Sequence, residues 1–201
     1  MQKLLAPVLI SSALLFAACG VDTTGLSAES SRTMMGSETA LVTLTEFGDL
    51  QCPACKAAHD ILTKPLLTKY DGKIRFEFKH FPLRNIHVYA LEAAEASECA
   101  ADQGKFWQFF DLTYANQDRL SGVALREWAA ELNLDAALFD RCVKSNIKEK
   151  TVLADFAEGS KLGVNSTPSY FVNGVRVPNN TLETLSAAID AALKNSSQVP
   201  L

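Results

Sequence analysis

The sequence predicts one α/β domain with an inserted α-helical subdomain, and three features of the chain predict it. Residues 39–50 and 74–83 alternate apolar and polar side chains, as strands do, and a helical pattern separates them. From about 86 to 163 the apolar spacing becomes helical, and a hairpin signal with a last helix follows. With 201 residues and 48% hydrophobic composition, the chain can bury one good core.

The charge balance argues against two classes of partner. The formal net charge is −4, and the lysines and arginines are scattered without a basic run. We therefore expect no nucleic acid and no anionic membrane surface as a charge-driven partner.

The first 19 residues predict an export signal. One lysine precedes an apolar run from Leu4 to Phe16, which is short for a membrane span, and Ala17 and Ala18 precede Cys19. This end resembles the lipobox of bacterial lipoproteins, in which the cysteine is lipidated. The alternatives are an ordinary cleaved signal and an uncut membrane anchor. We expect an exported protein on the periplasmic or extracytoplasmic face, anchored by lipid on Cys19, with residues 20–38 as a flexible tether.

The first strand leads directly into a helix that carries two cysteines. Cys52 and Cys55 lie at this strand-to-helix turn, and Pro53 occupies the first turn, where its missing N–H is harmless. The apolar spacing from Ala58 onward predicts that the helix continues to about residue 70, with a kink at Pro65. The second strand follows.

The rest of the chain contains residue patterns typical of helix ends and of a hairpin turn. Asp135 is placed to cap a helix, and Gly163 is placed to end the helix over 147–162. Asn173-Gly174 predicts a tight hairpin, and the spacing of Asn180 and Glu183 predicts a capping box before the last helix.

A Cys-x-x-Cys pair is compatible with a metal-binding site, a structural disulfide or a redox-active disulfide. A thiol at a helix N-terminus meets free N–H groups and the positive end of the helix dipole, so the pKa of Cys52 should fall. Cys55, one turn inside the helix, should be the less accessible, resolving thiol. A metal site of Cys52, Cys55 and His59 is the alternative, but His59 lies two turns beyond Cys52, so we expect no metal and no cofactor.

Three segments together resemble the DsbA-like branch of the thioredoxin superfamily. They are EFGDLQCPAC (46–55), ECAADQGKFWQFFD (98–111) and GVNSTPSYFVNG (163–174). The resemblance implies a thioredoxin fold with an inserted α-helical subdomain: a domain over 39–195, with the insert at about 86–163.

The resemblance also implies roles for particular residues. Thr167-Pro168 is similar to the family's cis-proline turn, which binds substrate, and a trans proline in an ordinary loop is the alternative. The dipeptide Pro53-Ala54 would tune the redox potential. It lacks the histidine of the most oxidising members, so we expect an oxidising but not extreme couple. Glu46 is similar to a buried acid that relays protons, and a solvated glutamate is the alternative.

Cys99 and Cys142 are expected to form a second disulfide. Lipidation of Cys19 would leave an even set of four cysteines in an oxidising compartment, and some relatives carry a second pair in the insert. The alternative is two buried free thiols.

These residues support three hypotheses for function. The first is an exported thiol:disulfide oxidoreductase that introduces disulfides through a Cys-Pro-Ala-Cys site. The second is a reductase or isomerase kept reduced by a membrane donor, and the third is a redox-inert or metal-binding lipoprotein on the same fold. Under the first hypothesis, the expected partners are reduced or unfolded exported proteins and a membrane redox partner that recycles the Cys52–Cys55 pair, and the protein is expected to be a monomer.

Overall fold

The computed structural model describes residues 21–196 and has a five-stranded sheet at its centre. The strand order is β1-β3-β2-β4-β5, with β2 and β3 parallel and the other pairs antiparallel. The strands are β1 (Met35–Gly36), β2 (Val42–Gly48), β3 (Ile74–His80), β4 (Ser169–Val172) and β5 (Val175–Arg176). The α/β prediction is confirmed, and within residues 21–196 no helix is long and apolar enough to cross a membrane.

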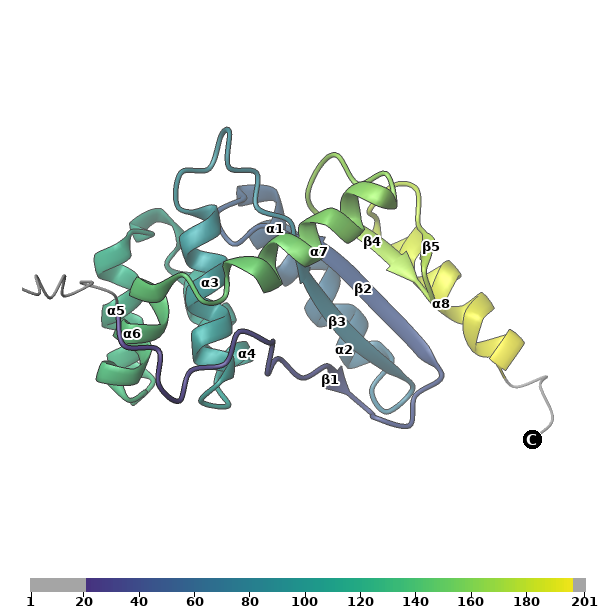
Figure 1. The fold of residues 1–201 in the computed structure, drawn as a ribbon. Helices are drawn as coiled ribbons and strands as arrows, with labels where there is room; N and C mark the ends of the chain where they lie inside the picture. Colours follow the sequence, from purple (N-terminus) through teal and green to yellow (C-terminus); the bar gives the residue numbers. More distant parts are fainter. Residues whose placement is uncertain (1–20, 197–201) are drawn as a thin grey trace, which may run out of the picture.

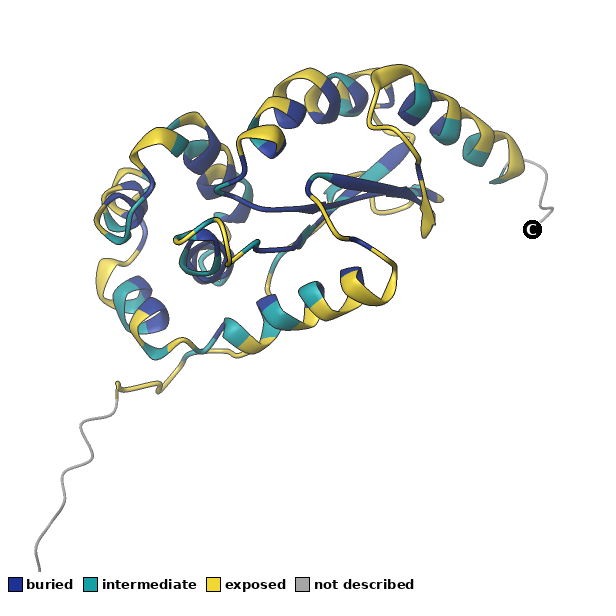
Figure 2. Cartoon of the chain, turned by 90° about the horizontal axis from the view of Figure 1, so that it is seen from above, coloured by how far each residue is buried: buried dark blue, intermediate teal, exposed yellow. Residues whose placement is uncertain are grey.

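Helices cover both faces of the sheet (Figures 1 and 2). One face is covered by α1 (Pro53–Ala58), the π-helical turn η1 (His59–Thr63), α2 (Lys64–Lys69) and α8 (Leu182–Ser196). The hydroxyl of Tyr70, at the end of α2, donates to Ser186 O and Asp190 Oδ1 of α8. On the other face, α7 (Glu149–Lys161) packs Gly159 against Phe47 and Phe81. Strand alternation therefore sends Leu44 and Glu46 toward α1, and Phe47 toward α7.

The predicted irregularity at Pro65 takes the form of a π turn. Proline has no N–H and its ring crowds the preceding turn, so regular α-helix cannot continue through it unchanged. The N–H of Lys64 bonds to the carbonyl of His59, five residues back, which closes η1. This wider turn shapes the backbone below the two cysteines.

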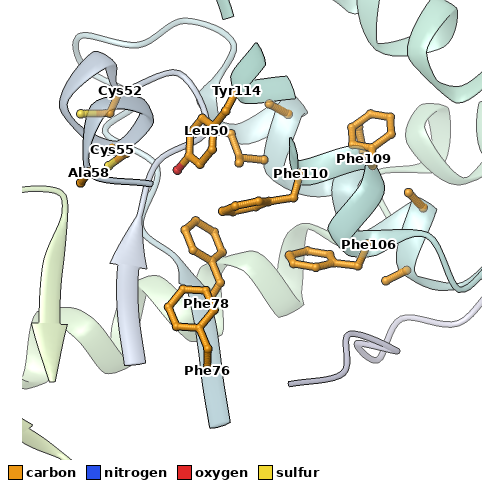
Figure 3. Packing of buried hydrophobic residues seen from close by; sticks show 14 of the residues in the cluster. Leu50, Cys52, Cys55, Ala58, Phe76, Phe78, Phe106, Phe109, Phe110 and Tyr114 are labelled. Atoms are coloured by element: carbon orange, nitrogen blue, oxygen red, sulfur yellow. The ribbon is translucent and has the colours of Figure 1, made fainter. Parts of the chain in front are cut away.

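A helical subdomain lies between β3 and β4 (Figure 1). Its core is aromatic, with Phe106, Phe109 and Phe110 of α4 fully or nearly buried (Figure 3). A disulfide joins Cys99 of α3 to Cys142 of α6, with 5.9 Å between their Cα atoms. The helices before α7 are α3 (Ala90–Ala101), α4 (Phe106–Ala115), η2 (Gln117–Arg119), α5 (Gly122–Glu131) and α6 (Ala136–Ser145).

The flexible tether expected over residues 20–38 is wrong for its described part. Residues 21–36, here called the N-terminal strap, lie along the helical subdomain and end in β1 (Figure 1). Arg32 pairs with Glu98 and with Asp155, and its guanidinium lies 5.4 Å from the Phe106 ring centroid. The buried Lys148 ammonium donates to Glu29 O at 2.6 Å. The strap is polar because it neutralises and hydrogen-bonds buried charges of the subdomain. The predicted signal over 1–19, with Cys19, lies outside the described residues.

The structure contains the predicted helix cap at Asp135 and the predicted hairpin turn, but not the predicted capping box. Asp135 Oδ1 accepts from Leu138 N at 2.9 Å, as expected of a cap. Asn173 and Gly174 both have positive φ (47° and 78°), as a type I′ hairpin requires. The capping box at Asn180 is wrong, because Thr181 Oγ1 accepts from Thr184 N and caps α8. Asn180 instead donates to the carbonyl of Pro168 at 2.7 Å.

Candidate active site

Cys52 is the N-cap residue of α1, directly after the β2 end of the sheet. Its backbone is extended, with φ −75° and ψ 120°, and Pro53 begins the helix. Pro53 and Ala54 are exposed, while Cys52 and Cys55 are buried free thiols. The exposed edge of the site is therefore formed by the dipeptide and by the small accessible part of Cys52, which is 6% exposed.

The surroundings of Cys52 stabilise its thiolate. The pKa of Cys52 is lowered to about 5, chiefly because the Cys55 thiol donates a hydrogen bond to its sulfur. Burial opposes this shift, while the Thr167 side chain and the N–H groups of Cys55 and Ala54 add to it. These N–H groups are the unsatisfied donors of the first helical turn. Cys52 is consequently a thiolate at neutral pH.

The surroundings of Cys55 favour its protonated thiol. Its side chain is fully buried, and burial raises its pKa well above the ordinary value. The hydrogen bond to Cys52 and the charge of Glu46 act in the same direction, while the N–H of Asp49, 3.5 Å from the Cys55 sulfur, opposes them. The structure thus separates the two thiols into one ionised and one protonated group.

Glu46 lies in the protein interior beneath the cysteines rather than in solvent. Its carboxyl is fully buried, and burial raises its pKa to about 7. Thr63 donates to Glu46 Oε2 at 3.0 Å and lies 2.9 Å from the Tyr170 hydroxyl, while Glu46 Oε1 has no hydrogen-bond partner among the described residues. A carboxyl with this pKa can take up and release a proton near pH 7.

The peptide bond between Thr167 and Pro168 is cis, and this turn lies beside Cys52. The Cys52 thiol is 3.7 Å from the carbonyl oxygen of Thr167. Asn180, which precedes α8, bonds the Pro168 carbonyl and so holds the turn from the other side. The structure therefore brings together Cys52, Cys55, Glu46, Thr167 and Pro168, and leaves the Cys99–Cys142 disulfide elsewhere, within the helical subdomain.

The sequence reasoning missed several residues that support the site. Asp49 is buried and accepts from Gln51 N, from Leu83 N and, at 2.7 Å, from the His87 ring. Gln117, in the helical subdomain, donates to the carbonyls of Leu50 and Cys52 at 2.9 and 3.0 Å. An aspartate next to a Cys-x-x-Cys turn is a weak sequence signal for the supporting role of Asp49. No local pattern indicates the role of Gln117, because Gln117 is 65 residues from Cys52.

His59 does not join the cysteines. Its Nε2 lies 2.8 Å from Asp111 Oδ1, and its ring packs against Phe110 and Tyr114. In the part of the chain that the structure describes, no group of three or more His, Cys, Asp or Glu side chains could hold a metal ion. The histidine therefore links α1 and its π turn to α4.

Comparisons with known proteins agree with this geometry. A family model described as Thioredoxin matches residues 28–191. The chain superposes on Wolbachia pipientis α-DsbA1 with a TM-score of 0.71 and 23% identity, covering 82% of this chain and 92% of that one. A thioredoxin-like oxidoreductase from Silicibacter pomeroyi gives 0.69 and 27%, with 82% and 93% covered.

A curated relative is similar over part of its length. The Na(+)/H(+) antiporter NhaA 3 of Salinispora tropica is 35% identical over 199 residues, which are 98% of this chain and 30% of the relative. The chain thus spans about a third of that antiporter. The family match, the fold and the paired thiols lead to one conclusion: the chain belongs to the thioredoxin family, and it has the fold seen in Wolbachia pipientis α-DsbA1.

Proposed function

We propose that this protein is an extracytoplasmic thiol:disulfide oxidoreductase that introduces disulfides into reduced exported proteins. The comparisons support disulfide chemistry in general. The direction of that chemistry, the clients and the location are our proposal.

The contrast between the two thiols carries the proposal. The pKa of Cys52 is lowered to about 5, and that of Cys55 is raised. A stabilised thiolate lowers the free energy of the reduced protein, so its disulfide is a stronger oxidant. A low-pKa thiolate is also a good leaving group, which speeds release of the client.

The reaction balances as follows. A client thiolate attacks the Cys52 sulfur of the Cys52–Cys55 disulfide, and Cys55 leaves with the electron pair. Because its pKa is raised, Cys55 takes up a proton, for which the buried carboxyl of Glu46 is the proposed donor. A second client thiolate then attacks the client sulfur of the mixed disulfide and releases Cys52 as a thiolate. Two electrons pass to the protein, and the client gains one disulfide.

The backbone at the Thr167-Pro168 turn is the proposed binding site for the client. The turn ends at β4, and its backbone lies next to the reacting sulfur. An extended client segment would pair with the backbone of Thr167, before β4 begins, through main-chain hydrogen bonds, which suits clients of varied sequence.

The location and partners belong to the same proposal. The Cys99–Cys142 disulfide supports an oxidising compartment, where structural disulfides persist. The predicted signal ending at Cys19 supplies export and a lipid anchor. Regeneration of the Cys52–Cys55 disulfide requires an oxidant, for which we propose a membrane redox protein, with this chain acting as a monomer.

The reduction potential of the Cys52–Cys55 pair tests the direction. We expect equilibration with glutathione to give a couple more oxidising than thioredoxin's, whose potential is about −270 mV. The oxidised protein should also form disulfides in a reduced unfolded substrate, and Cys55→Ser should accumulate a mixed disulfide through Cys52. A potential near thioredoxin's, with reduction of insulin and no substrate oxidation, would favour the reductase.

A further inference from the structure

An exposed arginine lies at the edge of the proposed client-binding site and has no assigned role. Arg176 is on β5, opposite Phe171 in the β4–β5 ladder, and its side chain extends along β4 toward the cis-proline turn. Its Nη2 donates to Ser169 Oγ at 3.3 Å, and its Nη1 donates to the carbonyl of Gly163 at 2.8 Å. Among the described residues Arg176 forms no ion pair, so its charge has no carboxylate partner there.

Arg176 lines a surface pocket of about 480 Å³ that also includes the cis-proline. One part of the lining comes from the turn, with Ser166, Pro168 and Ser169, and the other part comes from β5 and the loop after it, which carries Asn180. Of the described residues that line this pocket, Arg176 alone is charged. Asn180 uses one amide hydrogen on the Pro168 carbonyl and keeps a second for a ligand. The pocket therefore combines a cation with neutral hydrogen-bond donors.

A short chain of contacts connects this pocket to the reacting sulfur. The Cys52 sulfur lies 3.7 Å from the carbonyl oxygen of Thr167, and Thr167 directly follows Ser166 of the pocket lining. The carbonyl of Ser166 accepts from Ser169 Oγ at 2.8 Å, and this hydroxyl accepts from Arg176. An extended client advances about 3.4 Å per residue, so a residue two positions from the client cysteine lies about 7 Å along the chain. A long side chain at such a position reaches the guanidinium.

The guanidinium selects the class of ligand. An arginine has five N–H donors in a planar fork, and Gly163 and Ser169 use two of them. The remaining donors match the two oxygens of a carboxylate, in a charge-assisted pair that is stronger than a neutral hydrogen bond. The two existing bonds also hold the guanidinium in place before a ligand arrives, which reduces the entropy lost on binding. In a polypeptide, the side chains that carry a carboxylate are those of aspartate and glutamate.

We propose that this pocket is a subsite for a client carboxylate, supplied by an aspartate or glutamate near the client cysteine. Arg176 binds this side chain, while the backbone of Thr167 binds the client main chain. The inference rests on the proposed function for the identity of the client. It adds a determinant of specificity to a site whose main-chain contacts suit clients of varied sequence.

The rate of mixed-disulfide formation measures the preference. Peptides with one cysteine carry glutamate or glutamine at one to three positions before or after it, and the cysteine is joined to 2-thiopyridine by a disulfide. In the whole chain with Cys55→Ser, the Cys52 thiolate attacks the peptide sulfur. The mixed disulfide forms, and the leaving group takes up a proton from solvent as pyridine-2-thione, whose absorbance gives the rate.

The expected effect is that of one partly exposed ion pair. At one spacing, the glutamate peptide should react about three- to fivefold faster than the glutamine peptide. This ratio is divided by the ratio measured with Arg176→Gln in the same Cys55→Ser chain, which removes the effect of the glutamate on the peptide disulfide itself. The preference should shrink in 0.5 M salt, because added salt screens an exposed pair.

Three variants assign the effect to Arg176. The preference should disappear in Arg176→Gln and remain in part in Arg176→Lys, which keeps the charge without the planar fork. Arg84→Gln, in the exposed loop after β3, changes the net charge equally and should leave the preference unchanged. Circular dichroism shows whether Arg176→Gln is folded.

A binding measurement tests the subsite in the unmodified protein, even if Arg176→Gln unfolds. A glutamate peptide in which serine replaces the cysteine should shift the Nε–H resonance of Arg176, and the matching glutamine peptide should shift it less. Because this peptide contains no thiol, the result does not depend on the direction of disulfide exchange, which the reduction potential tests independently.

Four outcomes would overturn the proposal. Equal rates for the two peptides at every spacing, or a preference that survives Arg176→Gln, removes the subsite. An equal loss of preference in Arg84→Gln would indicate a general effect of net charge. Acetate that shifts the Arg176 resonance at the same concentration as the glutamate peptide would indicate a site for a free carboxylate and remove the client.

Discussion

The sulfur of Cys52 lies 3.7 Å from the carbonyl oxygen of Thr167, the residue that precedes the cis proline. The two residues are 115 positions apart, and neither the helix nor the hairpin alone makes a site. Their meeting puts the reactive thiol next to backbone that a client strand could use. The predictions below follow from this arrangement and from the buried charges around it.

The Cys55 thiol is the main cause of the low pKa of Cys52. Cys55→Ala removes this donor, so the pKa of Cys52 should rise from about 5 toward its ordinary value. Cys55→Ser keeps a donor and should retain much of the shift. Ultraviolet absorbance of the thiolate, titrated with pH, measures both. Cys52 pKa values that stay near 5 in both variants would contradict a role for the Cys55 donor and leave the helix N–H groups as the main stabilisation of the thiolate.

The buried acid Glu46 should make stability depend on pH. The folded state raises its pKa from 4.5 to about 7, so the folded protein holds the proton more tightly than the unfolded chain. This contribution is greatest below about pH 4.5 and is lost as the pH rises to about 7. Glu46→Gln removes this pH dependence. The change in the free energy of unfolding caused by the substitution should therefore be about 3 kcal/mol more favourable at pH 8 than at pH 4.

Urea unfolding at several pH values measures this difference. Glu77→Gln, on the neighbouring strand and partly exposed, serves as the control and should change the pH profile little. An unchanged profile in Glu46→Gln would mean that folding does not raise the pKa of Glu46.

The N-terminal strap should contribute to stability through Arg32. The Arg32 side chain is 10% exposed and its partner Glu98 is fully buried. Burial alone would raise the pKa of Glu98, but the His80 hydrogen bond and the Arg32 charge lower it to about 2. Arg32→Ala leaves this charge without its main cation and should destabilise the fold by about 3 kcal/mol.

An exposed ion pair provides the comparison. Arg119 pairs with Glu127 at 2.8 Å, and both side chains are more than half exposed. Arg119→Ala should cost less than about 1 kcal/mol in urea unfolding. A similar small loss in Arg32→Ala would mean that the strap is not firmly docked.

The disulfide in the helical subdomain should stabilise the protein without taking part in exchange. Cys99 and Cys142 are separated by 43 positions, and on the chain-entropy model their bond contributes roughly 3 to 4 kcal/mol. The double variant Cys99→Ala, Cys142→Ala should therefore unfold at lower urea but keep the reduction potential of Cys52–Cys55. A shifted potential would indicate that the subdomain disulfide influences the active site.

The sequence by itself determined the elements whose causes are local. At three places a short residue pattern predicts the local backbone geometry, and the structure has the expected turn or cap at each: Pro53 after Cys52, Asp135 before its helix, and Asn173-Gly174. The depressed pKa of Cys52 also has mainly local causes, because the Cys55 thiol, which lowers it most, and the N–H groups of Cys55 and Ala54 all lie within three residues of it.

Tertiary structure decided what depends on distant contacts. Strand alternation shows that Glu46 and Phe47 face opposite ways, but only the packing of α1 and α7 shows that Glu46 lies under the cysteines. The strap resembles a tether because its residues are polar, yet their partners are buried charges 66 to 123 positions away. A short pattern cannot encode such pairings, because the energy of a charged or polar side chain depends on which groups the fold brings to it.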